Sequence, residues 1–174
     1  SDSARLDAEV LLAHVLGCPR ISLYTSFEDV VSLDQRKQFR DLVRRRGNGE
    51  PVAYLVGTKE FFSLNFNVSP SVLVPRPETE GLVVRVLDVC KETFSETHVP
   101  TIIDVGTGSG AIAVTLAKHL AQASISASDI SEDALRQARE NASQHHVDDR
   151  ITFIQCDLLD DPELMRPWDI IVSN

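Results

Sequence analysis

The segment at residues 104–110, Asp-Val-Gly-Thr-Gly-Ser-Gly, constrains the fold of this chain more than any other. It directly follows the apolar run 101–103 and directly precedes the apolar residues 111–114. A strand, a glycine-rich turn and a helix in this order are typical of parallel α/β sheets, which bind a nucleotide-like ligand over the start of the helix. We therefore expect a ligand site at this turn.

The spacing of the glycines and the acid before them indicate which ligand binds. Dinucleotide folds usually keep Gly-x-Gly-x-x-Gly, whereas this chain has Gly-x-Gly-x-Gly with Asp104 two residues ahead of the first glycine. A carboxylate there suits a positively charged ligand, such as the ammonium of S-adenosylmethionine. Ala111 also completes Gly-x-Gly-x-x-Ala, so an NAD site stays possible, as does a turn without ligand. The predicted cofactor-binding residues of this segment are Asp104, Gly106, Thr107, Gly108, Ser109 and Gly110.

Two later strands are also expected to end in acidic residues. Asp129 closes the predicted strand 124–129, about 20 residues after the glycines, where a carboxylate can accept both ribose hydroxyls. It could instead cap the following helix, although Ser131 fits that role better. Asp157 follows the predicted strand 151–156 and suits the adenine amine, and Leu158 could pack on the ring. A polar strand end without a ligand is the alternative for Asp157 alone, but acids at the ends of three consecutive strands favour a binding site.

Asn174 follows the predicted strand 168–173 and is the predicted catalytic residue. Its carboxamide can accept a hydrogen bond from a planar substrate NH2 and so orient the nitrogen toward a methyl donor. By itself, an asparagine at a strand end is also a common turn residue.

The rest of the pattern predicts an α/β protein with a Rossmann-like methyltransferase sheet, incomplete at the C-terminus, after a small helical domain and a β-hairpin linker. The apolar spacing predicts helices over 5–16, from Ser32 to Gly47 and over 52–56. Ser32 with Gln35 three residues later fits a capping box at the start of the second helix. Period-two alternation over 60–74 predicts a strand or hairpin, and the alternating elements of 101–174 predict a parallel sheet with helices on both faces. The expected division is a helical substrate-recognition domain at 1–57, a hairpin and proline-rich linker at 58–77, and a partial methyltransferase domain at 78–174.

Composition excludes several other classes. A formal net charge of −9 over 174 residues argues against nucleic acid as the substrate. The three cysteines contain no Cys-x-x-Cys pair, and the five histidines have no ligand spacing, so we expect no metal site and a cytoplasmic location. No stretch approaches the length of a membrane span.

With these residues identified, the chain resembles the release-factor glutamine methyltransferases, the HemK/PrmC family, over essentially its whole length. The most specific segment is the proline-flanked loop Val74-Pro75-Arg76-Pro77-Glu78-Thr79-Glu80, which generic methyltransferases lack. The other matching segments are 6–12, 50–57, 60–62 and 104–110. Against this family the chain reads as truncated at both ends, since the family motif Asn-Pro-Pro-Tyr would begin at Asn174.

The resemblance implies methyl transfer from S-adenosylmethionine to the glutamine amide in the Gly-Gly-Gln motif of class I peptide chain release factors. It implies that residues 106–110 and Asp129 hold the cofactor and that Leu158 borders the adenine, a position that is aromatic in some relatives. Asn174 would bind the glutamine amide, Arg76 and Glu78 would also bind substrate, and the helical domain would help to grip the release factor.

Three other functions are compatible with parts of this pattern. An adenine-amine nucleic-acid methyltransferase would also present Asn-Pro-Pro-Tyr to an exocyclic NH2, but it needs a phosphate-tracking surface that the acidic charge disfavours. A non-catalytic module with the same fold would need no complete catalytic motif. An NAD-dependent oxidoreductase would need an acid/base residue for hydride transfer, and the sequence offers no clear candidate.

Overall fold

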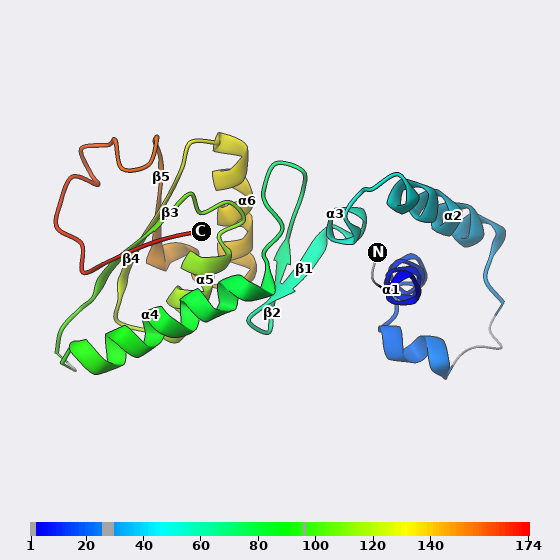
Figure 1. Cartoon of the computed structure of the whole chain (residues 1–174), viewed down its shortest axis with the longest axis horizontal. Helices are drawn as coiled ribbons and strands as arrows, with labels where there is room; N and C mark the ends of the chain where they lie inside the picture. Colours follow the sequence, from blue (N-terminus) through cyan, green and yellow to red (C-terminus); the bar gives the residue numbers. More distant parts are fainter. Residues whose placement is uncertain (1–2, 26–29, 96) are drawn as a thin grey trace. The chain divides into compact units, whose positions relative to one another are not determined.

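A computed structural model describes residues 3–25, 30–95 and 97–174 (Figure 1). The chain divides into two compact units, Ser1–Gly57 and Thr58–Asn174. The first unit is helical, and the second contains a β-hairpin and a four-stranded parallel sheet.

The helical unit matches the expected elements closely. It contains α1 (Ala4–Leu16), a 3₁₀ turn (Arg20–Tyr24), α2 (Leu33–Gly47) and α3 (Val52–Val56). Ser32 and Gln35 form the predicted capping box, because each side chain accepts a hydrogen bond from the other's backbone N–H. Asp7 of α1 pairs with Arg46 of α2 at 2.7 Å, which joins the two longer helices by an ion pair as well as by packing.

The second unit begins with a hairpin of β1 (Thr58–Phe61) and β2 (Leu64–Asn67). The alternation over 60–74 predicts a strand or hairpin, and a hairpin is present, but Phe62, an apolar position of that alternation, lies in the turn rather than in a strand. Phe62 and Ser63 form the turn, with φ of 51° and 60°, a conformation that non-glycine residues rarely adopt. The Glu80 carboxylate accepts a hydrogen bond from the Phe62 N–H at 2.9 Å, which helps to hold this strained turn.

The main sheet follows the predicted alternation of strands and helices. Its elements are a 3₁₀ turn (Pro77–Thr79), α4 (Glu80–Thr93), β3 (Thr101–Val105), α5 (Ala111–His119), β4 (Ser124–Asp129), α6 (Glu132–Gln144), a 3₁₀ turn (Asp148–Arg150), β5 (Ile151–Gln155) and β6 (Ile170–Ser173). All strands are parallel, in the order β5-β4-β3-β6. The strand order therefore reverses direction at β3.

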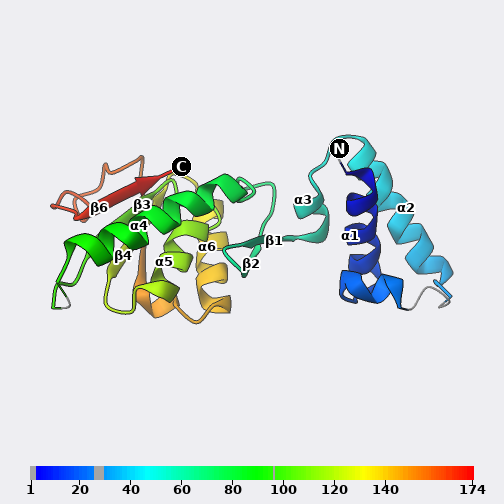
Figure 2. The ribbon, with the colours of Figure 1, turned by 60° about the horizontal axis from the view of Figure 1, so that its bottom comes forward.

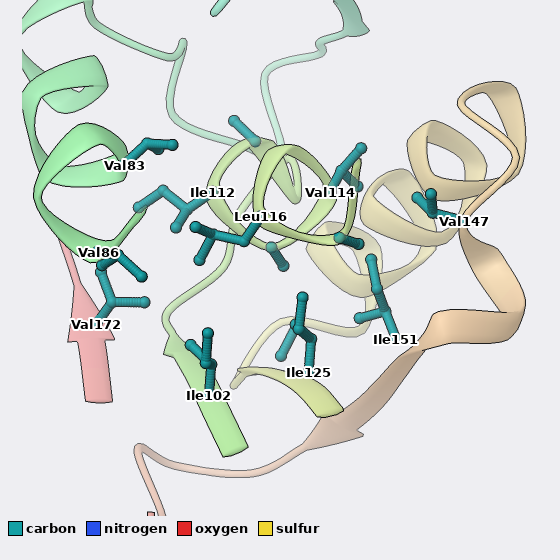
Figure 3. Close-up of a cluster of buried hydrophobic side chains, with 14 of the residues drawn as sticks. Val83, Val86, Ile102, Ile112, Val114, Leu116, Ile125, Val147, Ile151 and Val172 are labelled. Atoms are coloured by element: carbon teal, nitrogen blue, oxygen red, sulfur yellow. The ribbon is translucent and has the colours of Figure 1, made fainter. Parts of the chain in front are cut away.

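The expectation of helices on both faces of the sheet is wrong for the described residues. Figures 2 and 3 show α4, α5 and α6 on the same side of the sheet, with apolar side chains filling the space between. This core includes Ile102, Ile125, Ile151 and Val172 from the four strands. On the opposite face, Leu164 of the segment between β5 and β6 packs against Ile103 and Val105, with Leu159 and Trp168 partly buried beside them.

Within the described ranges, no helix is both long and apolar enough to cross a bilayer.

The contact between α5 and α6 depends on Gly110. A Cβ atom on Gly110 would lie 3.0 Å from the Cβ of Ala138, and its φ of +79° disfavours any side chain. We expect Gly110→Ala to lower the free energy of unfolding by roughly 2–3 kcal/mol through backbone strain and overpacking. Urea unfolding of the full-length protein measures this change.

Gly81 is the matched control for that substitution. It lies in α4, and a Cβ there would meet nothing within 4 Å. Gly81→Ala is therefore expected to raise the free energy of unfolding by roughly 0.5–1 kcal/mol. Equal effects of the two substitutions would contradict both the backbone strain at Gly110 and its close contact with Ala138.

Candidate functional site

The predicted site lies where the strand order of the sheet reverses. β3 has β4 on one side and β6 on the other, so the crevice at its carboxyl end is the topological switch point at which open α/β sheets bind ligands. The glycine-rich turn follows β3 directly, and Asp129 and Asn174 stand at the carboxyl ends of β4 and β6. The fold thus brings three of the predicted site segments to one edge.

The glycine-rich turn is tied to β4 through its own backbone. The N–H groups of Gly106 and Thr107 both donate to the Ser128 carbonyl, each at 2.9 Å. The Gly108 N–H donates to Oδ2 of Asp129 at 2.9 Å. Because three successive amides are used in this way, they are not available to a phosphate group.

Asp104 is buried below the turn, with 1% of its surface exposed. Its Oδ2 accepts hydrogen bonds from the Thr107 hydroxyl at 2.6 Å and from the Ala113 N–H at 3.2 Å, so it joins the turn to the first residues of α5. Its Oδ1 is buried and has no hydrogen-bond partner among the described residues. Burial raises the pKa of Asp104 to about 6, although the bonds from Thr107 and Ala113 oppose this shift.

Asp129 is half-buried and binds two backbone segments. Its Oδ2 accepts from Gly108, and its Oδ1 accepts from the Ser131 N–H at 3.0 Å. Ser131, as the sequence suggested, is the residue that caps α6, since its hydroxyl accepts from the Ala134 N–H. Each carboxylate oxygen of Asp129 keeps a further lone pair for a ligand hydroxyl.

Asp157 and Leu158 lie beyond the end of β5 and are both exposed. Leu158 has φ of 54°, which is unusual for a residue with a branched side chain, and 69% of its surface is exposed. Its carbonyl accepts a hydrogen bond from the Ser128 hydroxyl at 2.9 Å, which fixes this conformation. An exposed leucine held in a strained conformation is compatible with a contact surface for an apolar ring.

A small pocket of about 90 Å³ joins Asn174 to the glycine-rich turn. Gly106–Ser109, the first residues of α5 and Asn174, which follows β6, line this pocket. Leu73 and three residues of the proline-flanked loop, Val74, Pro75 and Thr79, line it as well. The predicted catalytic residue and part of the predicted cofactor turn therefore share one cavity.

Arg76 and Glu78, the two predicted substrate-binding residues of the proline-flanked loop, lie outside this pocket. Both are exposed, and neither is among the residues that line this pocket in the described part of the chain. Thr79, which lies in the same loop, is 8% exposed and does line it. Sequence reasoning missed Thr79, although it belongs to the proline-flanked motif that carried the resemblance.

No cluster of three or more His, Cys, Asp or Glu side chains within the described ranges could hold a metal ion.

Comparison with known proteins identifies relatives of both units. The PrmC N-terminal domain model matches residues 1–57, and a methyltransferase domain model matches residues 98–174. The release factor glutamine methyltransferase of Rhodopirellula baltica is 52% identical over 174 residues, 100% of this chain and 59% of that protein. The protein of the same name from Chlorobaculum tepidum is 42% identical, over 99% of this chain and 60% of its own length. This chain thus spans about three-fifths of the length of these two relatives.

Solved structures support the fold of the sheet unit. The N-terminal domain of human METTL16 in complex with SAH has a TM-score of 0.53 at 21% identity, and the match covers 64% of this chain and 46% of that one. A SAM-dependent methyltransferase from Agrobacterium tumefaciens also has a TM-score of 0.53, at 16% identity, over 67% of this chain and 38% of its own. At these identities, the likeness concerns the fold alone.

The raised pKa of Asp104 predicts a pH-dependent stability. Unfolding returns its pKa to about 3.9, so the folded state binds this proton more tightly than the unfolded state does. The stabilising contribution is complete below about pH 4 and is lost as the pH rises through about 6. Asp104→Asn lacks this titration, so its stability relative to the parent should increase over that interval, by up to about 3 kcal/mol.

Urea unfolding of both proteins at pH 4, 5, 6 and 7 measures that difference, and titrations shared by the two cancel. A difference that stays constant with pH would contradict the raised pKa of Asp104.

Proposed function

We propose that this chain, which belongs to the release factor glutamine methyltransferase family, is part of an enzyme that methylates the glutamine of the Gly-Gly-Gln motif in class I release factors. The methyl group would come from S-adenosylmethionine and go to the side-chain amide nitrogen. The observation that carries the proposal is the pocket shared by Asn174 and the glycine-rich turn, in a chain whose whole length matches this family.

The residues at the turn fit S-adenosylmethionine better than a dinucleotide. The Asp104 carboxylate, buried below the turn with an Oδ1 that has no partner among the described residues, places a negative charge near the site that favours a positively charged ligand. Asp129 has lone pairs for ribose hydroxyls, and the helix start leaves the N–H groups of Ala111 and Ile112 without intrahelical acceptors for a carboxylate. Asp157 and the exposed Leu158 are proposed to border the adenine.

The chemistry asked of the protein is mainly orientation. S-adenosylmethionine would supply an electrophilic methyl group; the electron pair of the broken methyl–sulfur bond would stay on the sulfur and neutralise its positive charge. The Asn174 carboxamide oxygen would accept a hydrogen bond from the glutamine NH2 and turn the nitrogen lone pair toward that methyl group. The apolar wall formed by Leu73, Val74 and Pro75 would keep water away from the amide during the transfer. No nucleophilic residue or metal is required, and the amide proton leaves to water after transfer.

The remaining parts of the proposal concern the partner. Residues 1–57 are proposed to bind the release factor, in line with the match of this unit to the PrmC N-terminal domain model. Arg76 and Glu78, exposed on the proline-flanked loop, are proposed to contact the same substrate at the mouth of the pocket. A cytoplasmic location follows from a release factor substrate and is supported by the unpaired cysteines.

Substitution of Asn174 tests the proposed mechanism. Asn174→Ala in the full-length protein should lower kcat by at least roughly 100-fold, as loss of an orienting hydrogen bond does at other active sites, with little change in S-adenosylmethionine affinity. Radiolabelled methyl transfer and isothermal calorimetry measure the two quantities. Equal losses of turnover and cofactor affinity would contradict the role of Asn174.

Ser173→Ala is the matched control for that measurement. The Ser173 hydroxyl donates to the Val105 carbonyl at 2.9 Å, so this variant loosens the same strand end without removing the carboxamide. It should retain most of the activity.

Competing substrates test the proposed reaction. The full-length protein and labelled S-adenosylmethionine should label a class I release factor, and replacement of the motif glutamine in that factor should abolish the label. Labelling of an adenine-containing oligonucleotide instead would assign the protein to the nucleic-acid methyltransferases. Binding of the cofactor with no transfer to either substrate would indicate a non-catalytic module.

A further inference from the structure

Asn141 is a buried polar residue in the middle of an otherwise apolar helix face. Its exposed fraction is 0%, and the other buried residues of α6 are apolar: Ala134, Leu135, Ala138 and Ala142. Asparagine is a poor helix former, and burying an amide costs free energy unless its hydrogen bonds are satisfied. A specific set of partners should therefore account for it.

The Asn141 side chain joins the β-hairpin to the glycine-rich turn. Its Nδ2 donates to the Ser109 carbonyl at 2.8 Å and to the Asn67 carbonyl at 3.0 Å. Its Oδ1 accepts from the Asn67 N–H at 2.8 Å. Both N–H groups and the carbonyl oxygen of the Asn141 side chain therefore have hydrogen-bond partners. The bond to the Ser109 carbonyl is the one that connects this side chain to the glycine-rich turn.

That contact fixes the orientation of one peptide group in the turn. The peptide between Ser109 and Gly110 donates from its N–H to the Thr107 carbonyl at 2.9 Å and accepts at its carbonyl from Asn141. A peptide held at both ends cannot rotate without breaking two hydrogen bonds. Ala138, one turn earlier on α6, packs against Gly110 at the same point.

The earlier residues of the turn are held by hydrogen bonds to β4 and to Asp104. The Ser109–Gly110 peptide is instead held by a hydrogen bond from α6. Its orientation sets the direction in which the chain enters α5, and therefore where the free N–H groups of Ala111 and Ile112 point. Ala111 and Ile112 are among the residues that line the pocket, together with Gly106–Ser109.

We propose that Asn141 is a positioning residue for cofactor binding, which keeps the Ser109–Gly110 peptide in the orientation that presents the start of α5 to the cofactor. This inference rests on the proposed function for the identity of the cofactor. Asn141 does not line the pocket, so it acts through Ser109 rather than on the ligand.

Gln144 provides a control that separates the turn from the hairpin. Its Nε2 donates to the Asn65 carbonyl at 2.8 Å, and its Oε1 accepts from Asn67 Nδ2 at 2.9 Å. It therefore attaches α6 to the same hairpin strand as Asn141 does, and neither bond reaches the turn. Gln144→Ala weakens the hairpin contact alone.

The experiment uses the full-length parent, Asn141→Ala, Asn141→Ser and Gln144→Ala. Calorimetric titration with S-adenosylmethionine gives the Kd, methyl transfer at saturating cofactor gives kcat, and urea unfolding gives stability. Asn141→Ala should raise the Kd and the cofactor KM roughly tenfold, because the released Ser109–Gly110 peptide keeps the binding orientation in only about a tenth of the molecules. The kcat at saturating cofactor should stay within about twofold of the parent. Gln144→Ala should leave the Kd unchanged.

Asn141→Ser guards against a failure of the alanine variant to fold. Its small polar side chain leaves room for a water molecule beside the Ser109 carbonyl. The free energy of unfolding of Asn141→Ser should therefore lie closer to that of the parent than its Kd does.

Four outcomes of this experiment decide between the interpretations. A Kd that rises for the Asn141 variants but not for Gln144→Ala supports the positioning role. Parent-like cofactor binding in folded Asn141 variants of reduced stability would overturn it, as would an equal rise of the Kd in Gln144→Ala, which assigns the effect to the hairpin. If the parent itself does not bind S-adenosylmethionine, the proposed function fails instead.

Discussion

The candidate site depends on a single carbonyl oxygen, that of Ser128, which accepts the N–H groups of both Gly106 and Thr107. Val105 is paired with Ser128 in the β3–β4 register, so the turn begins where that register ends. The next residue of β4, Asp129, then lies beside Gly108. The Ser128 hydroxyl meanwhile binds the Leu158 carbonyl. A shift of one residue between β3 and β4 would therefore misplace every proposed cofactor contact on β4 and β5.

The way polar groups are satisfied at this edge explains what kind of ligand it suits. Three backbone N–H groups of the turn donate hydrogen bonds to β4. One carboxylate oxygen of Asp104 accepts from Thr107 and Ala113. What remains for a ligand is carboxylate lone pairs, the first N–H groups of α5 and an apolar wall. A zwitterionic, positively charged molecule with hydroxyls can use all of these, whereas a pyrophosphate would find the turn amides already bonded. The turn is also held in place before any ligand arrives, which reduces the entropy cost of binding.

Much of this arrangement could be predicted from local patterns, because strands, helices and caps depend on nearby residues. The capping box at Ser32, the strand ends at Asp129 and Asn174, and the α6 cap at Ser131 are examples. The turn at Phe62 could not be predicted, since it lacks glycine or asparagine and depends on Glu80, which is distant in sequence. Asn141 was missed for the same reason: its partners, Ser109 and Asn67, lie 32 and 74 residues away.

The contacts between α6 and β2 have a consequence for the solubility of the hairpin. In a two-stranded hairpin, alternate residues of each strand direct their backbone N–H and C=O groups away from the partner strand, and such an edge can recruit a strand from another molecule. On β2 these residues include Asn65 and Asn67, whose carbonyls and one N–H are bonded by Gln144, His145 and Asn141. The side chains of a helix thus take the place of a third strand, and they close this edge against intermolecular β-pairing.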